Sequence, residues 1–116
     1  MCRRRKKYLI RKLSEVPTER SSCGYRQSLL TYRDKELIGF HIVKISDAKK
    51  HYHKQTTEYY FVLEGKGKIE LDDEVIDVGE GDLIVIKPGV KHRAFGDIKA
   101  LIISVPPFTE EDMYFS

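Results

Sequence analysis

HYHKQTTEYYFVLEGKG, residues 51–67, decides the fold, because two histidines and a glutamate stand in it at spacings that favour a single site. Side chains alternate across a strand, so His51 and His53 share a face if residues 51–53 are extended. The KQTT segment that follows can turn the chain and bring Glu58 back to that face from a neighbouring strand. Two imidazoles and a carboxylate that converge in this way suit a divalent transition metal.

A second stretch, residues 81–92, reads GDLIVIKPGVKH and ends in another of the four histidines. In order and separation the two stretches resemble the two motifs of the cupin superfamily, and the resemblance covers approximately residues 25–108. The matching residues are His51, His53, Glu58, Gly65, Gly81, Pro88, Gly89 and His92. Two positions depart from the motifs: Ile45 stands where the first often begins with glycine, and Gly96 where the second often ends in asparagine.

The resemblance implies one divalent transition metal per chain, at a centre of three histidines and one glutamate. The ligands it implies are His51, His53, Glu58 and His92. Mixed nitrogen and oxygen ligation suits Fe, Mn, Ni, Co, Cu or Zn and does not choose among them. On a six-coordinate ion, four protein ligands leave two positions for water or substrate.

His41 and Tyr60 are the candidate catalytic residues beside the metal. If the polar Lys44 faces outward, alternation turns His41 inward, and Tyr60 shares the face of Glu58. His41 could act as a general base, or could be a buried, hydrogen-bonded core histidine. Tyr60 could donate a hydrogen bond to a bound anion, or could be an amphipathic core aromatic. Gln27 is a further candidate for the mouth of the site.

Short strand-like runs separated by turns every eight to twelve residues predict an all-β antiparallel sandwich or barrel. The cupin resemblance implies a double-stranded antiparallel β-helix, the jelly-roll barrel, with the metal inside. We expect a two-residue hairpin turn at Asp72–Asp73, a loop over 18–24 and helical periodicity only near 109–113. The expected strands cover residues 8–16 (or a short ordered arm), 26–32, 37–45, 58–63, 68–71, 74–78, 83–86, 92–95 and 99–105.

Length and composition predict one soluble domain. The chain has 116 residues, 34% charged and 41% hydrophobic, and its apolar runs are shorter than a membrane span or a signal peptide requires. We therefore expect a cytoplasmic protein with no membrane partner. Cys2 and Cys23 are too few for a disulfide framework and are expected to be reduced thiols. No CxxC or Cys-His spacing supports Cys23 as a metal ligand or nucleophile.

The N-terminus is basic, and we divide the chain into a tail over residues 1–12 and a barrel domain over 13–116. Seven cations and no acid fall in the tail, which leaves 14 basic and 18 acidic residues in the remainder. Such a tail could touch nucleic acid or an acidic surface, but a solvated terminus is the favoured interpretation, because no recognition element accompanies it. Nucleic-acid contact is expected to be non-specific at most.

Outward aromatics predict a subunit contact. Tyr52, Tyr59, Phe61 and Phe95 fall on the outer faces of their strands, and such a row needs cover from a second copy or from the arm over residues 8–16. Small cupins commonly pack such sheets together, so the resemblance implies a homodimer.

Three functions are compatible with these observations. The favoured one is a metal-dependent enzyme for a small molecule, of oxygenase, isomerase or lyase type. The alternative is a module that binds or senses a sugar-like or carboxylate-like ligand without turnover. In the third, the barrel is a scaffold that serves the basic tail and a macromolecular partner. The fold by itself does not choose among them.

Overall fold

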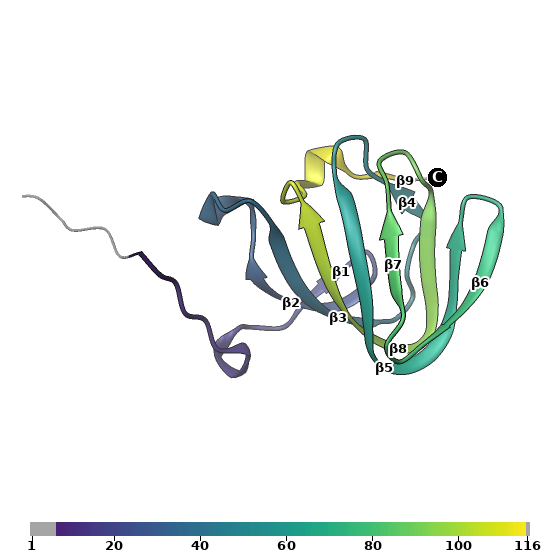
Figure 1. Cartoon of the computed structure of the whole chain (residues 1–116), viewed down its shortest axis with the longest axis horizontal. Helices are drawn as coiled ribbons and strands as arrows, with labels where there is room; N and C mark the ends of the chain where they lie inside the picture. Colours follow the sequence, from purple (N-terminus) through teal and green to yellow (C-terminus); the bar gives the residue numbers. More distant parts are fainter. Residues whose placement is uncertain (1–6, 116) are drawn as a thin grey trace, which may run out of the picture.

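The computed structural model describes residues 7–115, which form nine strands and three short 3-10 helices (Figure 1). The strands are β1 (Glu19–Ser21), β2 (Gly24–Leu30), β3 (Gly39–Ile45), β4 (His51–Tyr52), β5 (Thr57–Leu71), β6 (Glu74–Gly79), β7 (Leu83–Ile86), β8 (His92–Val105) and β9 (Tyr114–Phe115). The helices are η1 (Leu13–Glu15), η2 (Tyr32–Asp34) and η3 (Glu110–Asp112).

The two long strands β5 and β8 form the spine of the sheet. They pair antiparallel from Thr57 opposite Val105 to Leu71 opposite His92. On the free edge of β5 lie β7 and then β6, and on the free edge of β8 lie β3 and then β4. The sheet continues from β3 through β2 to β1, and β9 closes on β4. This curled antiparallel sheet confirms the predicted jelly-roll barrel (Figure 1).

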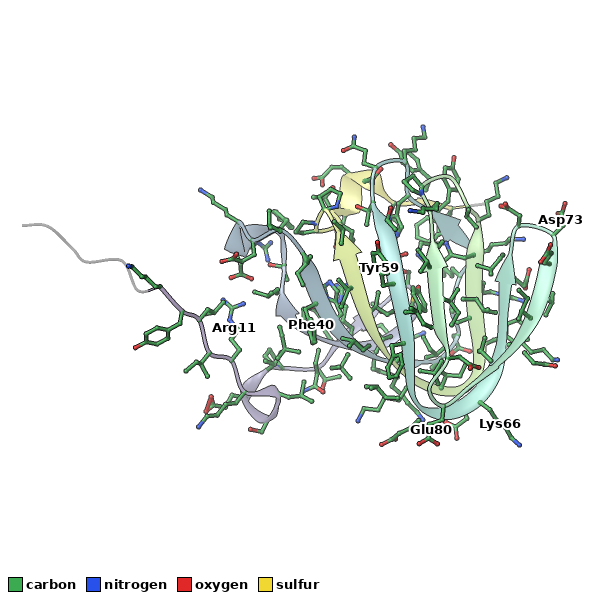
Figure 2. The ribbon with its side chains drawn as sticks, in the orientation of Figure 1. Arg11, Phe40, Tyr59, Lys66, Asp73 and Glu80 are labelled. Atoms are coloured by element: carbon green, nitrogen blue, oxygen red, sulfur yellow. The ribbon has the colours of Figure 1, made fainter. Side chains whose placement is uncertain are left out.

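Glycines bend β5 and β8 without interrupting the pairing between the two strands. Residues 58–63 and 68–71 were predicted as separate strands, as were 92–95 and 99–105, but each pair belongs to one strand. Gly65 and Gly96 have φ of 84° and 108°, which bends the backbone while the ladder continues. In Figure 2 Lys66 lies at the bottom of the curl and Asp73 at the far tip of the β5–β6 hairpin.

Inside the curl, alternation decides which side chains form the core. On β3 the burial pattern places His41, Val43 and Ile45 inward and exposes Lys44, as the sequence predicted. Neighbouring strands add apolar groups at the same depth, which gives a continuous core. Its members are Val43, Ile45, Tyr60, Val62, Ile69, Val78, Ile86, Ala94, Ile98, Ala100 and Ile102.

The strand predicted over residues 8–16 is wrong. This segment is held to the barrel by side-chain hydrogen bonds and makes no backbone pairing with a described strand. Arg11 donates to the carbonyl of Leu29 and to both carboxylate oxygens of Asp34, at 2.5–2.8 Å. Gln27 donates to the carbonyl of Leu13, the first residue of η1, and to that of Val16, which follows the helix. The segment is therefore an ordered arm that ends in a helical turn, which was the other possibility.

Three local predictions had different outcomes. The loop predicted over 18–24 contains β1, because the open edge of β2 pairs with its backbone whatever its side chains are. The Asp72–Asp73 hairpin turn is confirmed, with Leu71 opposite Glu74 and Asp72 at φ 53°. Near residue 112 the weak helical periodicity corresponds to η3, a single 3-10 turn.

Within residues 7–115, no helix is long and apolar enough to cross a bilayer. The cytoplasmic location and the division into a tail and a barrel domain stay predictions. Most of the cations of the tail lie outside the described residues.

The bend of the spine generates a stability prediction. A Cβ on Gly96 would lie 2.7 Å from the Cα of Gly67, at a φ of 108° that side chains avoid. Gly96→Ala should therefore lower the free energy of unfolding by about 3 kcal/mol in urea titrations. Gly81→Ala is the matched control, since Gly81 also has positive φ (87°) but open space around it. Its cost should be about 1 kcal/mol, and equal costs at the two sites would contradict a packing constraint.

Candidate metal centre

The structure brings the four predicted metal ligands together inside the barrel. His51 lies on β4, directly opposite His92 at the start of β8. His53 follows β4, and Glu58 lies near the start of β5. All four side chains are buried, and one ligand atom from each can be chosen so that the set lies within 4.8 Å. The geometry thus provides a nitrogen-rich group of the right size to hold one divalent ion.

A backbone carbonyl orients each of the three imidazoles. The Nδ1 atoms of His51, His53 and His92 lie 2.9 Å from the carbonyl oxygens of Lys49, Asp112 and Val90, respectively. A carbonyl can only accept, so each Nδ1 carries the hydrogen. The lone pair of each neutral ring is then on Nε2, the nitrogen left for the ion.

Glu58 lies between two of these nitrogens. Its Oε1 is 3.2 Å from Nε2 of His53 and 3.0 Å from Nε2 of His92. Oε1 and the His92 Nε2 are both fully buried, and neither makes a well-directed hydrogen bond within the described residues. Lone pairs that face a carboxylate in this way repel one another unless a cation lies between them. The donor set therefore fits a metal ion.

Electrostatics keep these groups ready for a cation. Burial alone would raise the pKa of Glu58, but hydrogen bonds and charge from His53 and His92, which require a proton on Nε2 in place of the metal ion, hold it well below its usual range. Burial, with His92 nearby, lowers the pKa of His51 to about 4, so this ring is neutral at pH 7. Burial would also lower the pKa of His53, but its contact with Glu58 raises it. A proton therefore competes with a metal ion for His53.

Beside the cluster lies a small cavity, and both candidate catalytic residues line it. Its volume is about 30 Å³, room for one or two waters. The Nδ1 of His41 is 2.8 Å from Oγ of Ser28, whereas its buried Nε2 has no hydrogen-bond partner within residues 7–115. Burial lowers the pKa of His41 to about 4, so the ring is neutral at pH 7.

Tyr60 and Cys23 also line this cavity. Burial, with Glu58 nearby, raises the pKa of Tyr60 well above its usual value, so its hydroxyl stays protonated and can donate. The Cys23 thiol contacts this hydroxyl, and burial raises its pKa to about 11. Such a thiol is a poor nucleophile, and Cys23 is outside the four-residue cluster found within the described residues.

Sequence reasoning placed one residue wrongly and missed two. Gln27 does not line the mouth; it faces outward and holds η1. Its neighbour Arg26 faces inward and lines the cavity instead. Asp112 was also missed: its carboxylate accepts from the backbone N–H of Lys54 and Gln55, while its carbonyl orients His53. No motif marks either missed residue, although strand alternation pairs Arg26 with inward Val43.

The chain belongs to the cupin domain family, since the model of that family matches residues 40–104. An uncharacterized protein of Methanocaldococcus jannaschii is 39% identical over 66 residues. That match covers 53% of this chain, and the chain spans about half of the relative, again 53%.

Two solved structures are similar over nearly the whole chain. A protein from Planctomyces limnophilus is 28% identical, with a TM-score of 0.85 and coverage of 93% of this chain and 96% of that one. Pac13 from Streptomyces, a nucleoside dehydratase, is 19% identical, with a TM-score of 0.82 and coverage of 96% and 92%. At this identity, the likeness to Pac13 shows the fold alone.

The geometry predicts the metal content. Full-length protein should bind about one divalent ion per chain, because its four buried ligand atoms form a single cluster. His53→Ala or His92→Ala should remove most of the bound metal in elemental analysis after dialysis. Lys66→Ala, at an exposed position of β5, should leave the metal content unchanged. Full metal retention in either histidine variant would refute the assignment of ligands.

Proposed function

We propose that this protein is a metal-dependent enzyme that acts on a small molecule at a centre formed by His51, His53, Glu58 and His92. One observation carries the proposal: His41, a neutral imidazole whose buried Nε2 has no hydrogen-bond partner within residues 7–115, shares the cavity with the ligands His51, His53 and Glu58. A purely structural histidine would be expected to have both nitrogens satisfied.

The candidate catalytic residues of the cavity are each assigned a separate role in the reaction. A divalent ion at the centre would polarise a carbonyl or carboxylate oxygen of the substrate. His41 would take a proton at Nε2, while Ser28 holds the ring through Nδ1. Tyr60 would donate its hydroxyl hydrogen to an oxygen that gains negative charge. These roles are those of an acid and a base placed around one reacting group.

This division favours an isomerase or a lyase over an oxygenase, because a base and a hydrogen-bond donor serve proton transfer. The similar fold of Pac13, whose reaction is a dehydration, is consistent with lyase chemistry in such a barrel. Oxygenase chemistry is the second candidate and would need an open position on the ion, which four protein ligands would leave on a six-coordinate metal. A non-catalytic module that binds or senses a sugar-like or carboxylate-like ligand is the remaining alternative.

The function is tested by following proton transfer directly. Metal-loaded protein is incubated in D₂O with small hydroxy acids, oxo acids and aldoses, and proton NMR detects exchange, isomerisation or elimination. His41→Gln should lower the rate about 100-fold or more, within the usual contribution of a general base, and should keep its metal. Unchanged turnover in this variant would refute the role of His41.

Two further outcomes separate the alternatives. Oxygen uptake with any of these compounds, measured with an electrode, would favour the oxygenase. Ligand binding by wild-type protein without any turnover would favour the sensing module.

We also propose that the protein is a homodimer built on the outer face of the sheet. Phe40, Ile103 and Tyr59 are adjacent there across β3, β8 and β5. On β7, Leu83 and Val85 are 60% and 44% exposed, so the arm does not cover this end of the face. The arm lies at the other end, where Leu9 borders a groove with Leu29 and Phe40. A second copy would bury the uncovered part.

Two of the four outward aromatics do not join this contact. Tyr52 stacks on Tyr114 with ring centroids 5.3 Å apart, and Phe95 lies under the guanidinium of Arg93. Both are covered within the chain, which leaves Tyr59 and Phe61 for the subunit contact.

The dimer is tested by placing charge on its surface. Leu83→Glu combined with Val85→Glu should convert a dimer at micromolar concentration to a monomer in sedimentation velocity, because two buried carboxylates would lack partners. Val75→Glu is the matched control, since Val75 is 56% exposed on β6, away from this face. A wild-type protein that sediments as a monomer would refute the proposal.

A further inference from the structure

Arg26 is a charged residue that points into the barrel. It lies on β2 opposite Val43, and its side chain is only 19% exposed. Its Nε and Nη2 both donate to one oxygen of Glu19, at 3.1 and 3.0 Å. A guanidinium has five N–H donors, and within residues 7–115 the Nη1 of Arg26 makes no hydrogen bond. Arg26 therefore keeps donors for a further acceptor.

Arg26 lies where three cavities meet. Arg26 and Phe108 line the small cavity at the metal cluster and also two larger ones outside it, of about 280 and 430 Å³. The guanidinium lies 5.3 Å from the Phe108 ring centroid, and that ring contacts His41 and His53 at 5.3 and 5.9 Å. A small molecule in an outer cavity that reaches toward His41 would pass this pair.

The charges at the junction select one kind of ligand. Burial is the main cause of the low pKa of His41, and the positive charge of Arg26 adds to it. Glu19 is more than half exposed and competes for the same donors. The outer cavity beside His41 is also bordered by Glu110 and Glu111. Arg33 also borders this outer cavity, but Arg26 is the arginine that lines the small cavity at the metal cluster as well. At that inner position one guanidinium balances a single negative charge better than the two of a phosphate.

We propose that Arg26 binds the carboxylate of a small monoanionic substrate, which displaces Glu19 and presents its reacting end to His41 and the metal ligands. This inference rests on the proposed function, since it names the substrate class of the same site. In the absence of substrate, the carboxylate of Glu19 occupies the position of the substrate carboxylate and holds the guanidinium in place.

The experiment measures binding by calorimetry, with metal-loaded, full-length protein. The probes are lactate and propanoate, their neutral counterparts lactamide and propanamide, and inorganic phosphate. Arg26→Gln should weaken the two carboxylates about tenfold or more, and Glu19→Gln should strengthen them severalfold, because a competing acceptor is removed. The amides should bind weakly and change little in either variant.

Arg93→Gln is the matched control. Arg93 is also paired with a glutamate, Glu70 at 2.6 Å, and also lies over a phenylalanine ring, Phe95 at 5.1 Å, but it is outside the cavities. Its replacement should leave carboxylate affinity unchanged. Metal content and thermal stability, measured for every variant, detect any general damage to the barrel.

Several results would overturn the inference. They are equal affinities in Arg26→Gln and Arg93→Gln, equal affinities for amides and carboxylates, tighter binding of phosphate, and no binding of either carboxylate to the wild type at millimolar concentration. Because binding needs no turnover, Arg26-dependent carboxylate binding in a protein without catalysis would leave this inference standing and remove only the enzymatic role.

Discussion

The folding of the β5–β8 ladder onto itself is the constraint on which the site depends. Glu58 pairs with Ser104 and His92 with Leu71, so these two ligands belong to rungs 13 residues apart along β5. In a flat sheet that separation would be about 40 Å, at about 3.3 Å per residue. Their ligand atoms are 3.0 Å apart. The metal centre therefore exists only because glycines let both strands bend at the same level.

Once the ladder is bent, orientation of the rings becomes the second requirement. Two imidazoles are held by carbonyls close in sequence, two residues before each ring. The third, His53, is held by Asp112 across the fold, and the same residue ties down the backbone after it. A buried cluster of neutral rings is costly to form, and these hydrogen bonds offset part of that cost while leaving Nε2 for an ion.

The sequence correctly predicted the features that depend on the two-residue alternation of side chains along a strand. Alternation placed His41 and Tyr60 inward and put His51 and His53 on one face, because it depends on neighbours within a few residues. His92 joined the predicted ligands only through the resemblance to the cupin motifs. The sequence-based prediction failed where residues far apart in the chain determine the structure. The predicted strands stopped before Gly65 and Gly96, since glycine weakens a strand locally, but pairing along the ladder carries each strand through these residues. Arg26 was overlooked because an arginine in a polar strand normally faces solvent.

The role of Asp112 has a consequence for the order of events during synthesis. The residue that steadies His53 lies 59 positions after it, and the short strand carrying His51 is completed by pairing with Phe115. A growing chain exposes its first ligands long before these restraints exist, and any ion captured then would be held loosely. The ligand geometry is thus complete only when the C-terminal segment has docked, since Asp112 and Phe115 belong to it.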